Sequence, residues 1–357
     1  MIHYFSNCTI TENGGIITAV SEPEDKSGDL PFAIPGFIDC HMHGALGIDV
    51  ATASTRELVK LARLLRAKGE AAFLPTIPAA SPAQNLSALK NISEAMKETV
   101  EDDSAALIAG CHMEGPFLCP AYKGALDEKV FCDASPYKWM ELTGPYESIV
   151  KRITVDPLRP GVIEMIPYFT EKGIQVSLGH SASDCDTANR AYGAGATSAT
   201  HLFSAMSPLK HREPGMVGAA LSNDEVTCEL ICDFLHVAPE AVRLSVKAKT
   251  PSRIAVITDS CQAAGMPDGE YVLGGRLIHV VKGEARMPEG QLASSTVFMK
   301  KELVNLVSLG FSLDDCAKML SENPARLSGI NDMGAIRPGM RFRVNAVNKR
   351  GELIRVY

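Results

Sequence analysis

PGFIDCHMHG, at residues 35–44, is a short apolar run that ends in two histidines. Side chains alternate in direction along a strand, so residues two apart point to the same side. His41 and His43 are therefore placed to meet one cation at the carboxyl end of a strand. A bare pair of this kind is a weak signal, because two surface or hydrogen-bonded histidines are the commoner explanation. Its place between the apolar residues 35–39 and Gly44, where a strand opens into a loop, favours metal ligands.

Outward from this stretch, strand-like and helix-like segments alternate along the chain. Short apolar runs predict eight strands, at residues 37–40, 71–77, 105–111, 149–155, 174–178, 196–200, 227–232 and 253–257. Helical spacing of apolar residues predicts helices that include residues 55–68, 86–100, 162–171, 187–194 and 239–247. This alternation favours an α/β fold, a (β/α)8 TIM barrel over residues 35–330. An open doubly wound sheet stays as the alternative, because the lack of a glycine-rich turn after the first strand excludes little.

The two ends of the chain have a different pattern. Residues 1–34 carry short strand-like pieces around Gly14-Gly15, and residues 331–357 carry further pieces broken by Pro338-Gly339. We expect these ends to pair into one small β domain beside the barrel. A hairpin-rich insertion is expected at residues 271–291, after the last barrel strand.

Composition narrows the class of partner. The chain has 357 residues, of which 46% are hydrophobic and 22% charged, enough for a large core. Its formal net charge of -7 offers no basic surface for nucleic acid or an anionic membrane, so we expect a small-molecule partner. The lack of a membrane-length apolar stretch and of a signal-peptide pattern predicts a cytoplasmic protein. Ten cysteines without a CxxC pair predict buried free thiols.

Four more candidate residues follow apolar runs. Glu114 comes after the third run, His180 and His201 after the fifth and sixth, and Asp259 after the eighth. Taken singly, a capping acid, a core histidine or a structural acid is the ordinary explanation of each. Barrel active sites, however, collect residues from the carboxyl ends of several strands. Glu114, His180 and His201 then form the three-ligand arrangement of a catalytic metal. Asp259 is then suited to take a proton from water and return it to a departing amine.

Several motifs, in chain order, resemble the N-acetylglucosamine-6-phosphate deacetylase family of the amidohydrolase superfamily. They include PGFIDCHMHG, then HMEGPFL at residues 112–118, HLFSAMSPL at residues 201–209, HREPG at residues 211–215, and residues 258–275. The resemblance implies a barrel with a β-sandwich, a homodimer, and metal-dependent hydrolysis of an amide. The implied reaction converts N-acetylglucosamine 6-phosphate to glucosamine 6-phosphate and acetate.

The resemblance also implies a role for each matching residue. Glu114, His180 and His201 match the principal metal ligands, and Asp259 matches the general base and acid for attack by metal-bound hydroxide. His41 and His43 match an extra pair found in members that hold two ions. We therefore expect one or two divalent ions per subunit, with zinc as the first choice and iron, manganese or cobalt as alternatives. The matching substrate-binding positions are Arg212, His236, Ser204, Ala205, Ala125 and Leu292. Arg212 and His236 match residues that reach the substrate phosphate across the dimer.

The chain departs from the family at a few positions. Leu126 stands where a polar residue, often histidine, helps to polarise the amide carbonyl, and Ser204 replaces an asparagine. These departures keep two alternatives open. One is an amidohydrolase of a different N-acyl substrate, such as N-acetylgalactosamine 6-phosphate or a non-phosphorylated amide. The other is a non-catalytic barrel that binds sugar phosphate.

Overall fold

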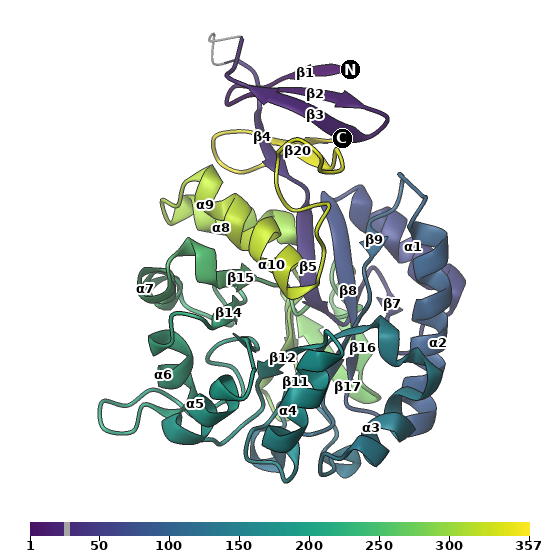
Figure 1. The fold of residues 1–357 in the computed structure, drawn as a ribbon, viewed down its shortest axis with the longest axis vertical. Helices are drawn as coiled ribbons and strands as arrows, with labels where there is room; N and C mark the ends of the chain where they lie inside the picture. Colours follow the sequence, from purple (N-terminus) through teal and green to yellow (C-terminus); the bar gives the residue numbers. More distant parts are fainter. Residues whose placement is uncertain (25–28) are drawn as a thin grey trace.

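A parallel sheet curls into a barrel at the centre of the protein in the computed structural model, which describes residues 1–24 and 29–357 (Figure 1). The order of its eight main strands follows the chain from β5 to β15, and the short β9 pairs with β8 outside this path. The strands are β5 (Phe37–Met42), β8 (Glu70–Pro78), β9 (Leu107–Ile108), β10 (Cys111–Glu114), β11 (Val150–Val155), β12 (Gln175–Leu178), β13 (Ser198–Ala199), β14 (Thr227–Leu230) and β15 (Ile254–Val256). The seam between β5 and β15 is bridged where the Asp259 N–H donates to the His41 carbonyl at 2.9 Å. The predicted (β/α)8 barrel is confirmed.

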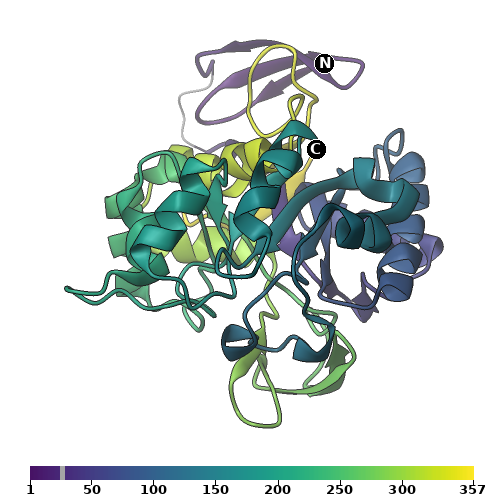
Figure 2. The same ribbon diagram turned by 60° about the horizontal axis from the view of Figure 1, so that its bottom comes forward.

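Helices surround this barrel (Figures 1 and 2). They are α1 (Thr55–Arg66), α2 (Pro82–Thr99), α3 (Pro136–Thr143), α4 (Val162–Glu171), α5 (Cys185–Gly193), α6 (Gly215–Ser222), α7 (Pro239–Lys249), α8 (Met299–Ser308), α9 (Leu313–Ala317) and α10 (Asn323–Leu327). Short helical turns add η1 (Pro120–Tyr122), η2 (Glu128–Val130), η3 (Gly144–Ile149), η4 (Pro251–Arg253) and η5 (Lys318–Glu322). Local sequence explains where α1 begins, because the Ser54 side chain and Glu57 form a capping box there. Its buried face, which includes Leu58, Leu61 and Leu65, is the predicted apolar stripe.

One predicted strand lies in the wrong place. The apolar run at residues 105–111 predicts a strand that ends before His112, whereas β9 covers Leu107–Ile108 and β10 covers Cys111–Glu114. The strand continues into polar residues because His112 and Glu114 are buried inside the barrel, where the hydroxyls of Thr76 and Thr154 and the imidazole of His180 contact them. Apolar patterning therefore places this strand too early.

Trp139 is a fully buried anchor between α3 and α4. Its ring meets Phe169 edge-on with centroids 4.9 Å apart, and its indole N–H donates to Glu147 at 2.7 Å. Replacing Trp139 by alanine should lower the free energy of unfolding by about 3–5 kcal/mol, because it leaves a cavity in the core. Urea unfolding followed by circular dichroism measures the loss. Tyr137→Ala, on the same helix but with a side chain 70% exposed, should change it by less than about 0.5 kcal/mol.

The two chain ends meet beyond one end of the barrel, at the top of Figures 1 and 2. One small sheet has the order β1 (Ile2–Tyr4), β2 (Thr9–Asn13), β3 (Ile16–Ser21), and the other β21 (Leu353–Val356), β20 (Val344–Val347), β4 (Phe32–Pro35). Their shared core contains Phe5, Ile10, Ile17 and Val344. Small antiparallel sheets of the expected kind are therefore present. The division at residues 34 and 331 stays a prediction, and residues 25–28 of its first segment lie outside the described residues.

The expected insertion is a four-stranded antiparallel sheet at the opposite end, visible at the bottom of Figure 2. Its strands are β16 (Gly269–Leu273), β17 (Arg276–Val281), β18 (Glu284–Arg286) and β19 (Leu292–Ser294); a smaller ribbon pairs β6 (Gly44–Ala45) with β7 (Ile48–Asp49). The ten cysteines are unpaired, as predicted, and most of them are buried. Among the described residues, no helix has the length and apolarity needed to cross a membrane.

Candidate metal centre

Six side chains from five strand ends converge inside the carboxyl rim of the barrel. His41 lies in β5 and His43 directly follows it, while Glu114 is the last residue of β10. His180, His201 and Asp259 lie two or three residues beyond β12, β13 and β15. Parallel strands deliver their carboxyl ends to the same rim, which is why residues far apart in the sequence meet here. The structure thus brings together all six predicted residues.

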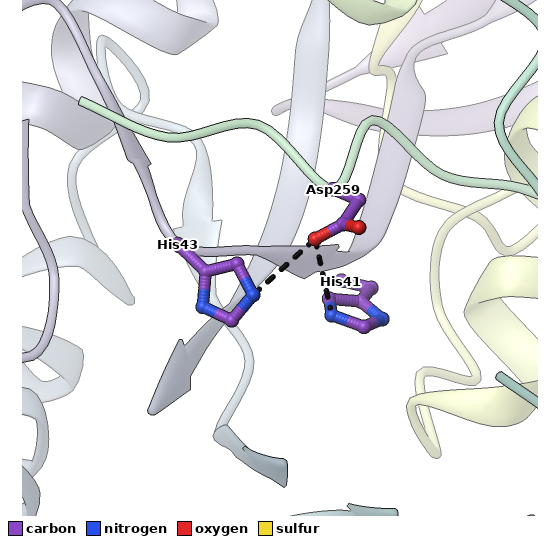
Figure 3. A group of neighbouring side chains, drawn as sticks. All are labelled: His41, His43 and Asp259. Carbon is purple, nitrogen blue, oxygen red and sulfur yellow. Dashed lines mark ion pairs between the residues drawn. The ribbon is translucent and has the colours of Figure 1, made fainter. Parts of the chain in front are cut away.

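These residues form two groups, in each of which the potential ligand atoms lie within 4.8 Å of one another. The first group is His41, His43 and Asp259. Asp259 Oδ1 lies 3.4 Å from His41 Nε2 and 3.2 Å from His43 Nε2 (Figure 3). Both imidazoles and the carboxylate therefore point to a common centre.

The second group is Glu114, His180 and His201. Glu114 Oε1 lies 3.1 Å from His180 Nε2 and 3.2 Å from His201 Nε2, and these two nitrogens are 3.1 Å apart. Glu114 also faces the first group, because Oε1 is 3.5 Å from His41 Nε2 and Oε2 is 3.3 Å from His43 Nε2. A carboxylate with oxygens toward both groups has the geometry to bridge two ions.

Hydrogen bonds on the far side of three imidazoles fix which nitrogen faces the centre. The Nδ1 atoms of His41, His43 and His180 contact Glu229 Oε2 at 3.1 Å, the Thr76 carbonyl at 3.0 Å and the Tyr122 carbonyl at 2.8 Å. These oxygens only accept hydrogen bonds, so Nδ1 carries a proton and Nε2 is the nitrogen left to offer a lone pair to a metal ion. This tautomer is the one that binds a metal, with the second nitrogen held by an acceptor.

The electrostatics of the centre also suit a cation. Burial by itself raises the pKa of Glu114, but His41 and the hydrogen bonds from His180 and His201 lower it well below its usual value. Burial lowers the pKa of His201, yet Glu114 and Asp259 raise it to about 9. The centre therefore favours positive charge. Histidine nitrogens and carboxylate oxygens in this arrangement fit a divalent metal ion, which would take the place of protons between the Nε2 atoms of His180 and His201.

Three of the six residues hold an unusual backbone conformation. The φ angles of His180, His201 and Asp259 are 47°, 31° and 48°, in the left-handed region that residues with a side chain adopt at a cost. Such strain persists where the surrounding structure enforces it, and it gathers at functional sites. In each case it turns the side chain inward directly after a strand.

Arg152 and Glu229 lie beneath the centre and are not among the residues predicted from the sequence. Both are fully buried and form an ion pair, and Glu229 accepts from His41 Nδ1 and from the His201 N–H at 3.2 Å. His112, which is in register with Arg152, is hydrogen-bonded to Thr154, and Thr154 to Thr200. The available signal is a charged residue within each predicted strand: Arg152 follows Lys151 in Val150–Val155, and Glu229 lies in Thr227–Leu230.

A cavity of about 380 Å³ opens on the two groups. Of the predicted substrate-binding residues, it is lined by Ser204, Ala205, His236, Ala125 and Leu292. Leu126 and Leu273 add apolar wall, and Asp233 orients His236 through a 2.7 Å contact to Nδ1. Arg212 is exposed and lines a neighbouring cavity of about 470 Å³ instead. Within one chain, Arg212 therefore lies apart from the other predicted substrate residues.

Comparisons with known proteins match nearly the whole chain and its fold. A model of the amidohydrolase family matches residues 32–356. The chain is 34% identical over 339 residues to an N-acetylgalactosamine-6-phosphate deacetylase of Escherichia coli O157:H7, covering 94% of this chain and 89% of that protein. It is also 34% identical over 355 residues to an N-acetylglucosamine-6-phosphate deacetylase of Bacillus subtilis (strain 168), with 96% and 89% covered. The crystal structure of N-acetylglucosamine-6-phosphate deacetylase from Thermotoga maritima matches with a TM-score of 0.91 at 29% identity, covering 100% of this chain and 98% of that one. The resemblance stated from the motifs is confirmed, and the chain belongs to the amidohydrolase family.

Proposed function

We propose that this protein is a metal-dependent N-deacetylase that converts N-acetylglucosamine 6-phosphate to glucosamine 6-phosphate and acetate. The observation that carries this proposal is the convergence of six side chains at one cavity: His43, Glu114, His180, His201 and Asp259 line it, and the buried His41 contacts Glu114 and Asp259. Relatives that span nearly the whole chain are deacetylases of amino-sugar phosphates, which supports the same reaction class here. A barrel that only binds sugar phosphate would have no use for an acid beside a metal centre.

We propose that Glu114, His180 and His201 hold one divalent ion and that His41 and His43, with Asp259, hold a second. When bound, such an ion lowers the pKa of water and polarises an amide carbonyl. Asp259 provides the proton transfer. Burial raises its pKa, but His41 and His43 lower it below its usual value, so the carboxylate is ionised and ready to accept a proton from the attacking water. It then returns that proton to the nitrogen of the leaving sugar amine.

The substrate phosphate is assigned to the side of the cavity that holds Ser204, Ala205 and His236. Asp233 keeps His236 in place, and an imidazole so held is a suitable donor to phosphate. Arg212 is exposed and outside this cavity, so we propose a homodimer in which each Arg212 serves the cavity of the other chain. A guanidinium there would bind two phosphate oxygens at once.

Arg212→Ala should raise the KM for a phosphorylated substrate by roughly 10- to 100-fold, because hydrogen bonds to charged groups contribute about 1.5–3 kcal/mol. The value of kcat should change little, since the phosphate lies away from the scissile amide. Steady-state kinetics with and without the 6-phosphate measure this effect. Arg190→Ala, another exposed arginine outside both cavities, should leave KM within about twofold. An unchanged KM in the Arg212 variant would contradict the assigned role.

Zinc is the ion that we propose, since histidine and carboxylate sets of this kind suit it, as they suit iron, manganese and cobalt. We also propose a cytoplasmic location. The unpaired state of the ten cysteines supports it, because thiols persist in a reducing compartment.

The decisive assay measures amine release by zinc-loaded protein from N-acetylglucosamine 6-phosphate, N-acetylgalactosamine 6-phosphate and both unphosphorylated sugars. Turnover of a phosphorylated sugar is expected. The galactosamine epimer is the second candidate, because the chain is 34% identical to relatives named for either sugar. A metal-loaded protein that hydrolyses none of the four sugars would overturn the proposal. In that case the apolar wall at Leu126 directs the search to other N-acyl compounds.

A further inference from the structure

We propose that Glu229 and Arg152 form a buried positioning pair that sets the affinity of the first group, His41, His43 and Asp259, for its metal ion. The inference rests on the proposed metal-binding role of that group. Neither residue touches the cavity: both act through the ligand that they hold.

Glu229 makes the contact that matters most, at the ring of His41. Its Oε2 accepts from His41 Nδ1 at 3.1 Å in a fully buried setting. The opposite ring nitrogen, Nε2, has no hydrogen-bond partner in the described structure and faces Glu114 and Asp259. A carboxylate at Nδ1 fixes the tautomer, orients the ring and makes Nε2 a stronger donor to a metal. His41 therefore depends on Glu229 for the state in which it can ligate.

Arg152 holds Glu229 in place. Its guanidinium pairs with Glu229 Oε1 and also donates to the Cys40 carbonyl at 3.3 Å and to Ser198 Oγ at 3.2 Å. These contacts tie β11 to β14, β5 and β13 at one depth of the barrel. Well-packed apolar residues would fill the same space with equal or better stability. The position of this pair, one hydrogen bond from His41, points to a role in the site rather than in folding.

The second group depends less on the Glu229 side chain. His180 has its own acceptor for Nδ1, the Tyr122 carbonyl. His201 contacts the Glu229 side chain through its backbone, where the His201 N–H donates to Glu229 Oε2. The adjacent Leu202 N–H donates to the Glu229 main-chain carbonyl at 2.9 Å, and this bond survives any change of side chain. Loss of the pair should thus weaken one ion selectively.

The test titrates the metal-stripped full-length protein with zinc in competition with a chromogenic chelator, which requires no substrate. His43→Ala and His180→Ala first identify the binding class that belongs to each group. In the double variant Arg152→Met/Glu229→Leu, the affinity of the class lost in His43→Ala should fall about 10- to 100-fold, while the other class changes less than about threefold. Arg152→Met/Glu229→Gln keeps an oxygen acceptor for His41 and should recover most of that affinity.

Two further variants keep the test decisive. Glu229→Asp retains the charge and the partner for Arg152 but withdraws the acceptor from His41, so it should fold and show an intermediate loss. Glu302→Gln changes another fully buried glutamate, which contacts no ligand, and should leave both affinities as they are. Thermal unfolding of the metal-free proteins reports any purely structural effect.

Unchanged zinc affinities in the Glu229 variants, or equal losses in both classes, would overturn the proposal. So would a wild-type protein that holds one ion and keeps it in His43→Ala. That last result leaves the proposed deacetylation intact, because one ion in the Glu114 group still serves the reaction, so the two proposals fail separately.

Discussion

Asp259→Asn should lower kcat for amino-sugar phosphate deacetylation by about 10²- to 10⁴-fold, the usual contribution of a general acid–base residue. Asparagine is close to aspartate in size and keeps an oxygen that faces His41 and His43, which lie 3.4 and 3.2 Å from Asp259 Oδ1. It cannot accept the proton of the attacking water or deliver it to the amine. Amine release under saturating substrate measures the change, with zinc content determined on the same sample.

The zinc measurement separates two causes of the loss. If the variant binds zinc as the wild type does, the lost rate belongs to proton transfer; if one ion is missing, part of it belongs to ligation. Asp224→Asn, which changes an exposed acid that does not line the cavity, is the matched control and should retain full activity. An Asp259→Asn variant with nearly wild-type kcat would refute the assigned role, whatever its metal content.

Removal of the metal should abolish deacetylation and lower the thermal unfolding temperature. An ion present at 100 times its Kd stabilises the folded state by about 2.7 kcal/mol, which is worth several degrees in Tm. The loss of a cation also leaves Glu114 and Asp259 in a buried centre with only histidine protons to balance them. Dialysis against a chelator, followed by calorimetry and by assay, measures both effects.

Zinc added back should restore activity and Tm together, whereas magnesium should do neither, because it prefers an all-oxygen octahedral shell. The control is the protein dialysed without chelator. Full activity of a protein shown by elemental analysis to contain no divalent metal would rule out the metal-dependent reaction.

The architecture of the site follows from the sequence to a large extent, and for identifiable reasons. His41 and His43 are recognisable because a strand repeats every two residues, and each of the other four ends an apolar run. What the sequence does not reveal is the support beneath them. Arg152 follows Lys151 in β11 and Glu229 lies in β14, and charged residues in a strand are equally typical of an exposed edge.

Two helices that are not named from the sequence, α6 and α8, share a physical cause. Nearly all of α6 is buried, and its small apolar residues have no polar face to mark a helical period. In α8 the buried face contains Glu302 and Asn305, so polar residues interrupt the apolar stripe that would predict a helix. The Asn305 side chain donates to the Cys232 carbonyl at 2.8 Å, a residue distant in the sequence. Periodicity identifies helices with one polar, exposed face and one apolar, buried face. Neither α6 nor α8 has this division.

The left-handed backbone at His180, His201 and Asp259 places activity and stability in opposition. Glycine at any of these positions would relieve the backbone strain, but it would also remove the imidazole or carboxylate. A stabilising substitution to glycine at any of these three positions would therefore remove a side chain of the proposed centre. A lineage that abandoned catalysis would be expected to drift toward glycine there, so the residue at these positions marks whether a related barrel still works as an enzyme.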